Sequence, residues 1–180
     1  YILQIVNGLI YLKDNKIIHN DIKPSNILIT NNFNQLKICD FGLSNQNDTH
    51  YAIHWSPIYI APEIYKKYKR TESVDVWSVG MIFYELIFGH NPFDHENDFI
   101  SLITYIKNDD DIQIPKNILL DTECTDLLKK MLTKDTIKRI DIKSIYENKW
   151  LNSTDDQIDI RDDFFIDYNC DDECEIFVIE

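Results

Sequence analysis

Residues 19–26 read HNDIKPSN, and this stretch constrains the fold of the chain more than any other. It places an acid, a cation and an amide close together, as Asp21, Lys23 and Asn26. The segment is polar and contains a proline, which favours a loop. An apolar pattern at helical spacing precedes it over residues 1–14, and a short apolar run follows it. The loop is therefore expected between a helix and a strand.

The residue types in this loop suit the transfer of a phosphoryl group, a reaction that needs positioning and charge neutralisation more than covalent help from the protein. The carboxylate of Asp21 can accept the proton of an attacking hydroxyl, and Lys23 can hold the transferring group as a point charge. Asn26 offers a neutral oxygen to a hard cation such as Mg²⁺. The alternative interpretation is a solvated polar loop without chemistry, and the motifs that follow argue against it.

Two apolar runs, Ile27–Thr30 and Leu36–Cys39, flank an Asn-rich segment and predict a hairpin of two short strands. The sequence DFG follows at residues 40–42, where an acid at a strand end stands beside an aromatic anchor and a flexible glycine. Residues 40–60 have no clean period and predict a long ordered loop, which the sequence APE closes at residues 61–63.

The remainder of the chain predicts helices. The segment Ser73–Phe88 is apolar on most faces, which indicates a central buried helix that Gly89 ends. Further helices are predicted at residues 1–14, 99–106, 123–132 and 142–146.

Composition fits a single soluble globular domain, because 44% of the 180 residues are hydrophobic and 27% are charged. The formal net charge is −13 and argues against a nucleic-acid partner. No apolar run reaches the ~20 residues of a membrane span, and no leader pattern is present. Tyr1 lies inside the helical pattern, so a fragment of a longer protein is expected.

Four cysteines occur without a CxxC pair, which predicts reduced thiols and an intracellular, cytoplasmic location. Cys170 and Cys174 could bind a metal or pair with each other, although solvated tail cysteines are the simpler interpretation. They lie in an acidic segment, residues 152–180, which also has apolar clusters and either docks on the domain or stays mobile.

These motifs, in this order, resemble the C-terminal lobe of the eukaryotic-type Ser/Thr protein kinase family over residues 1–151. The DVWSVG sequence at residues 75–80 and Arg139 add to the match. The resemblance implies a mainly α fold with a short β-hairpin at the catalytic site and without the N-terminal lobe. It implies transfer of the γ-phosphoryl group of ATP, with Mg²⁺, to Ser or Thr of a protein substrate. The DFG and APE surroundings are similar to AMP-activated/SNF1-related and autophagy-initiating kinases.

The resemblance also implies roles for single residues. Asp21 matches the catalytic base and Lys23 the phosphate-contacting lysine of Ser/Thr kinases. Asn26 and Asp40 match the two metal ligands, and Leu28 matches the floor of the adenine pocket.

Other matches concern support. Ser56 matches the hydroxyl residue that ties the substrate-binding loop to the catalytic residues. Glu63 and Arg139 match a buried ion pair, and Asp75 matches the helix acid that holds the catalytic loop backbone. His19 and Phe41 are expected to be buried spine and core residues rather than an acid, a base or a substrate contact.

The chain departs from the family pattern at Asn20, where the family has an arginine that pairs with a phosphate on the activation loop. We therefore expect no dependence on activation-loop phosphorylation by this route. No Gly-rich loop and no strand lysine paired with a helix glutamate are present, so the full-length protein is expected to supply an N-terminal lobe. The alternative function is a catalytically weak fragment or pseudokinase that acts as an interaction scaffold. A small-molecule kinase is disfavoured by the APE segment.

Overall fold

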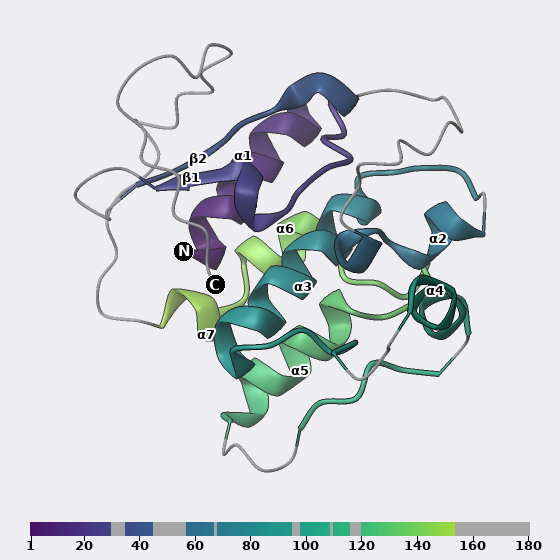
Figure 1. The fold of residues 1–180 in the computed structure, drawn as a ribbon. Coiled ribbons are helices and arrows are strands. Elements are labelled where there is room, and N and C mark those ends of the chain that lie inside the picture. Colours follow the sequence, from purple (N-terminus) through teal and green to yellow (C-terminus); the bar gives the residue numbers. More distant parts are fainter. Residues whose placement is uncertain are drawn as a thin grey trace.

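The computed structural model describes residues 1–29, 35–44, 57–66, 68–94, 98–108, 110–115 and 120–153. In these ranges the chain is mainly helical and has a two-stranded antiparallel sheet at one side of the helices (Figure 1). The elements are α1 (Ile2–Asp14), β1 (Ile27–Ile29), β2 (Leu36–Ile38), α2 (Pro62–Tyr65), α3 (Ser73–Phe88), α4 (Phe99–Lys107), α5 (Thr122–Met131), α6 (Ile142–Tyr146) and α7 (Lys149–Asn152).

Helix α3 is the centre of the fold, and α1 and α5 pack against it (Figure 1). Its residues from Val74 to Tyr84 are all buried, as the apolar sequence predicts. Gly80 allows the close approach of α5, because a Cβ there would lie 2.9 Å from Leu132 Cδ2. Gly89 ends the helix in the left-handed conformation at φ 72°, which glycine adopts without strain.

The hairpin places the two ends of the site next to each other. β1 pairs with β2 so that Ile27 lies opposite Ile38. Beyond this pair, the backbone N–H of Cys39 donates to the carbonyl of Asn26 at 3.0 Å. The end of the loop before β1 and the start of the segment after β2 therefore lie side by side at the same end of the hairpin. The side-chain oxygen of Gln4 in α1 accepts from the backbone N–H of Leu36 at 2.7 Å and fixes β2 on the helix.

The helix and strand predictions are confirmed to within about a residue at each end, and the small shifts have physical causes. Asp121 accepts from the N–H of Glu123 at 2.8 Å, so α5 begins at Thr122. Two helices of four residues, α2 and α7, were not predicted, because one turn is too short to show a period. Helix α2 begins with Pro62, a favoured first helical residue.

Some predictions fall outside the described residues. They concern the Asn-rich turn, the middle of the 40–60 loop with Ser56, and the acidic segment with Cys170 and Cys174. In the described part of the chain, none of the helices combines the length and the apolar character needed to cross a bilayer.

A buried ion pair joins α2 to the loop before α6. The two terminal nitrogens of Arg139 donate to the two carboxylate oxygens of Glu63 at 2.6 and 2.9 Å. Both side chains are almost fully buried, at 0% and 1% exposure. Arg139 also donates to the carbonyls of Ser73 and Thr133, each at 2.8 Å, and its guanidinium lies over the Trp77 ring. The arginine therefore joins α2, α3 and the segment after α5 to the loop before α6.

Breaking this ion pair from one side should destabilise the fold strongly. The Glu63→Gln substitution leaves the guanidinium of Arg139 buried without a counter-charge, which costs about 3–5 kcal/mol. Urea unfolding followed by circular dichroism measures the free energy of unfolding of the two proteins.

Asp126→Asn is the matched control, because Asp126 forms an exposed ion pair with Lys130 at 2.7 Å. Its loss should change the free energy of unfolding by less than about 1 kcal/mol. Similar losses in the two variants would contradict the structural role of the buried pair.

Candidate active site

The loop between α1 and β1 brings three of the predicted residues into direct contact. The Nζ of Lys23 donates to Oδ2 of Asp21 at 2.8 Å. The side-chain amide of Asn26 donates to the same oxygen at 3.0 Å and to the backbone carbonyl of Asp21 at 2.8 Å. A short 3₁₀ turn at Pro24–Asn26 returns Asn26 toward Asp21. A carboxylate with two donors on one oxygen is fixed in orientation and can accept a proton at the other.

Asp75 in α3 binds the backbone of this loop. Its two carboxylate oxygens accept from the backbone N–H groups of His19 and Asn20, both at 2.9 Å. Burial raises the pKa of Asp75 to about 7, although these two hydrogen bonds act in the opposite direction. The first turn of α3 thus fixes the two residues that precede Asp21.

His19 connects the loop to the DFG segment. Its Nε2 lies 3.0 Å from the carbonyl oxygen of Cys39, and since a carbonyl only accepts, Nε2 carries the proton. Its ring packs on Phe41 at a centroid distance of 4.8 Å. Burial lowers the pKa of His19, while the charges of Asp21 and Asp40 oppose that shift. The Nδ1 of His19 accepts from the backbone N–H of Asp21 at 3.3 Å, so the ring is neutral and contacts both the loop of Asp21 and the segment before Asp40.

Asp40 directly follows Cys39, whose carbonyl accepts from His19. Its backbone is left-handed, with φ 63°, and its side chain is exposed. Oδ1 accepts from the backbone N–H of Gly42 at 3.2 Å. A Cβ on Gly42 would lie 3.2 Å from that oxygen, so a side chain there would press on the acid. The DFG sequence thus combines an unusual backbone conformation with an exposed acid.

Leu28 and Ser56 complete the set of predicted binding residues. Leu28 lies in β1, two residues after Asn26, and is 6% exposed. Ser56 lies outside the described residues. The structure thus brings Asp21, Lys23 and Asn26 together, and the backbone hydrogen bond of Cys39 to Asn26 places Asp40 at the neighbouring end of the hairpin.

The metal-binding prediction can be tested against the chemistry of the donors. In the described part of the chain, no group of three or more His, Cys, Asp or Glu side chains could hold a metal ion. Asn26 and Asp40 supply one amide and one carboxylate, which alone are too few for Mg²⁺. Magnesium sites with phosphate ligands commonly use one or two protein carboxylates and complete the shell with phosphate oxygens and water. The donor set therefore fits a cation that binds together with a phosphate ligand.

The sequence did not reveal how the turn Pro57–Tyr59, directly after Ser56, is held. The hydroxyl of Ser78 donates to the carbonyl of Tyr59 at 2.8 Å, and the hydroxyl of Tyr65 donates to the carbonyl of Pro57 at 3.0 Å. The Tyr59 hydroxyl donates to Glu85 at 2.6 Å, and burial raises the pKa of that glutamate. No local pattern predicts contacts that join residues so far apart in sequence.

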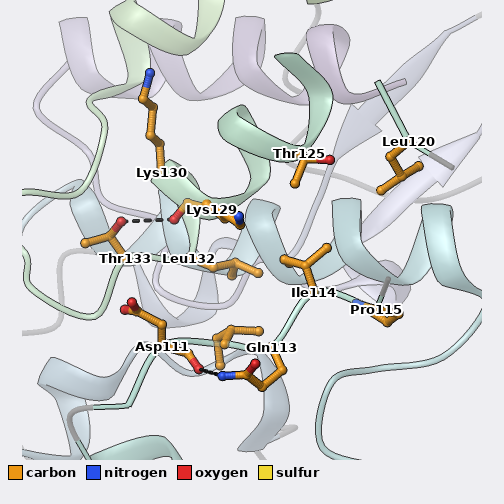
Figure 2. A pocket seen from close by; sticks show the side chains of 11 residues that line it. Asp111, Gln113, Ile114, Pro115, Leu120, Thr125, Lys129, Lys130, Leu132 and Thr133 are labelled. Carbon is orange, nitrogen blue, oxygen red and sulfur yellow. Dashed lines mark hydrogen bonds between the residues drawn. The ribbon is translucent and has the colours of Figure 1, made fainter. Parts of the chain in front are cut away.

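The structure also has a pocket of about 630 Å³ between α5 and the segment 111–115 (Figure 2). Side chains of Ile114, Leu132 and Lys129 are among those that border it. None of the site residues predicted from the sequence lines this pocket. It is therefore separate from the loop that carries Asp21.

The raised pKa of Asp75 predicts a pH dependence of stability. Between about pH 4 and 7 the unfolded protein has lost this proton and the folded protein keeps it, so the free energy of unfolding should fall as pH rises. The slope from this residue is at most about 1.4 kcal/mol per pH unit. Asp75→Asn removes it and serves as the reference.

Urea unfolding of both proteins at several pH values between 4 and 8 measures this difference. The stability advantage of the native protein over Asp75→Asn should be larger near pH 4 than near pH 7. Parallel curves for the two proteins across this range would contradict the assignment.

Comparison with known proteins gives a consistent result. The family model described as protein kinase domain matches residues 1–151. The mouse (Mus musculus) serine/threonine-protein kinase ULK3 is 33% identical over 156 residues, which cover 84% of this chain and 33% of the relative. The rice (Oryza sativa subsp. japonica) serine/threonine protein kinase OSK3 is 41% identical over 152 residues, which cover 82% of this chain and 29% of the relative.

A third relative, serine/threonine-protein kinase ATG1b of Arabidopsis thaliana, is 34% identical over 158 residues, or 84% of this chain and 22% of the relative. The chain thus spans about a third or less of the length of these curated relatives. The predicted resemblance to Ser/Thr protein kinases is confirmed by the family match and by these relatives. On these grounds, the chain belongs to the protein kinase domain family.

Proposed function

We propose that residues 1–151 are the C-terminal lobe of a protein serine/threonine kinase and that residues 152–180 form a separate acidic segment. In this proposal the lobe transfers the γ-phosphoryl group of ATP to a Ser or Thr hydroxyl of a protein substrate. The observation that carries it is the contact of Asp21 with Lys23 and Asn26, at 2.8 and 3.0 Å. Such a cluster can hold a hydroxyl nucleophile and neutralise a phosphoryl group in the same place.

Each residue of the cluster has a distinct proposed role. Asp21 accepts the proton of the attacking hydroxyl, and its fixed orientation favours that transfer. Lys23 contacts one oxygen of Asp21 through its Nζ. The same ammonium group can shift to contact a phosphoryl oxygen. Asn26 and Asp40 would hold Mg²⁺, which supplies charge neutralisation to the phosphates when bound. Leu28 would contact the adenine, and Ser56 would position the substrate.

The buried supports explain why the cluster would stay in place. Asp75 fixes the loop backbone, and the neutral ring of His19 fixes the carbonyl before Asp40. Catalytic groups need such constraints, since small misplacements lower the rate sharply. The N-terminal lobe expected in the full-length protein would cover the nucleotide.

Asp21→Asn is the direct test of catalysis. The amide oxygen can still accept the two hydrogen bonds, so the fold should be kept while the base is lost. In the longest form of the protein, phosphoryl transfer to Ser/Thr peptides should fall by about 10²–10⁴-fold. Initial rates with labelled ATP measure the loss, and thermal unfolding checks the fold.

Asp14→Asn is the control, since Asp14 is an exposed acid at the end of α1 and lies outside the cluster. It should leave the transfer rate unchanged. Undiminished transfer by Asp21→Asn would refute the proposed base. Absence of transfer by the unsubstituted protein would favour the alternative, an interaction scaffold with a kinase fold.

Residues 1–180 alone should bind Mg-ATP weakly. The described site offers one carboxylate and one amide to the metal, and the remaining contacts of the phosphates would have to come from the N-terminal lobe. Isothermal titration calorimetry of this chain with Mg-ATP measures the affinity. A micromolar dissociation constant would show that the lobe binds the nucleotide by itself.

A further inference from the structure

Asn20 has a backbone conformation that few residues adopt. Its φ is 68°, in the left-handed region, where asparagine is tolerated better than most non-glycine residues. Asn20 stands between His19, which is fully buried, and Asp21. Its own backbone N–H is held by Asp75 at 2.9 Å. The loop backbone therefore presents the Asn20 side chain in a defined direction.

That side chain reaches the segment beyond Asp40. The amide nitrogen of Asn20 donates to the carbonyl of Leu43 at 3.1 Å and, more weakly, to the carbonyl of Ile18 at 3.3 Å. Leu43 ends the 3₁₀ turn that begins with Phe41, directly after Asp40. The hydrogen bond therefore joins residues 23 positions apart in the sequence.

Together with His19, this contact brackets Asp40. The His19 ring holds the carbonyl of Cys39, the residue before Asp40, and Asn20 holds the carbonyl of Leu43, three residues after it. Asp40 itself has the left-handed φ of 63°, a conformation that persists in a non-glycine residue only where the surroundings fix it. Two neighbouring residues of one loop supply that constraint on both sides.

The rest of the Asn20 side chain contributes little to hydrogen bonding. Within the described residues, its Oδ1 is buried and has no hydrogen-bond partner, and the same holds for the hydroxyl of Ser44, next to Leu43. A buried polar atom without a partner is unfavourable. The NH₂ group of the amide is therefore the part that stabilises the contact with Leu43. Its removal should loosen the segment that contains Leu43.

We propose that Asn20 is a positioning residue that holds the segment after Asp40 against the catalytic loop through its hydrogen bond to Leu43. The role in catalysis rests on the proposed kinase function, whereas the contact itself does not. The bond is between neutral groups, so it is not screened by salt as an ion pair would be. Asp40 is thereby kept in the geometry in which it could bind Mg²⁺.

Two substitutions separate the hydrogen bond from the backbone conformation. Asn20→Asp keeps the shape and tolerates the left-handed region but replaces the donor by an oxygen that repels the carbonyl of Leu43. Asn20→Gly removes the side chain without backbone strain. Lys16→Gly is the matched control, because Lys16 has φ 59° and is exposed at the end of α1.

Hydrogen exchange in the present chain tests the contact without any enzyme assay. The amides of Gly42 and Ser44 should exchange about threefold to tenfold faster in both Asn20 variants, the factor expected for one net hydrogen bond. The amide of Lys37 in β2 should not change relative to the native protein. Lys16→Gly should leave all three rates unaltered. Unchanged rates at Gly42 and Ser44, or an equal rise at Lys37, would overturn the proposal.

An assay of the longest form of the protein tests the catalytic consequence. Asn20→Asp and Asn20→Gly should raise the Mg²⁺ concentration for half-maximal transfer at least threefold, whereas a mere loss of stability would not shift it. Faster exchange with an unshifted Mg²⁺ requirement would overturn the role in positioning Asp40. Faster exchange in a protein that transfers no phosphoryl group would support the contact and refute the kinase function.

Discussion

The carboxylate of Asp75 is the contact on which the site depends. It lies in the first turn of α3 and accepts the backbone N–H groups of His19 and Asn20. The side chains of those two residues then hold the carbonyls of Cys39 and Leu43, on either side of Asp40. One buried acid thus fixes both segments that carry the proposed catalytic groups. The raised pKa of Asp75 reflects the cost of its burial, which the two hydrogen bonds partly offset.

Helix α3 serves several parts of the site because it is buried on nearly every face. Ser78 and Glu85, further along the helix, hold the turn Pro57–Tyr59. Trp77 lies under the guanidinium of Arg139, whose ion pair fixes α2. The loop of residues 19–26, the turn Pro57–Tyr59 and α2 are therefore all supported by contacts with α3. Such support is what the positioning of reacting groups requires.

Much of this could be predicted from the sequence, for identifiable reasons. The strong apolar character of residues 73–88 and the glycine after them predicted α3 with its correct bounds. Asp21, Lys23 and Asn26 lie within one short loop, so their proximity follows from the chain itself. The ion pair of Glu63 with Arg139 was expected only through resemblance, since no local pattern joins residues 76 positions apart.

Other features depend on tertiary contacts that no local pattern shows. The left-handed backbone of Asn20 and its bond to Leu43 depend on how the loop meets the DFG turn. The sequence indicated only that an expected arginine was absent at this position. The tautomer of His19 is likewise set by the carbonyl of Cys39. The roles of Ser56 and of the acidic segment stay predictions, because these residues lie outside the described ranges.

We propose that a nucleotide-bound metal would be held between the loop of Asn26 and the DFG segment of Asp40. Paramagnetic broadening of backbone NMR signals by Mn²⁺-ATP, in the longest form of the protein, locates the metal. Signals around Asn26 and Asp40 should broaden first, while those of Thr125 and Lys129 in the separate pocket stay sharp. Selective broadening at the pocket, with sharp signals at Asn26 and Asp40, would rule out a metal at the proposed position.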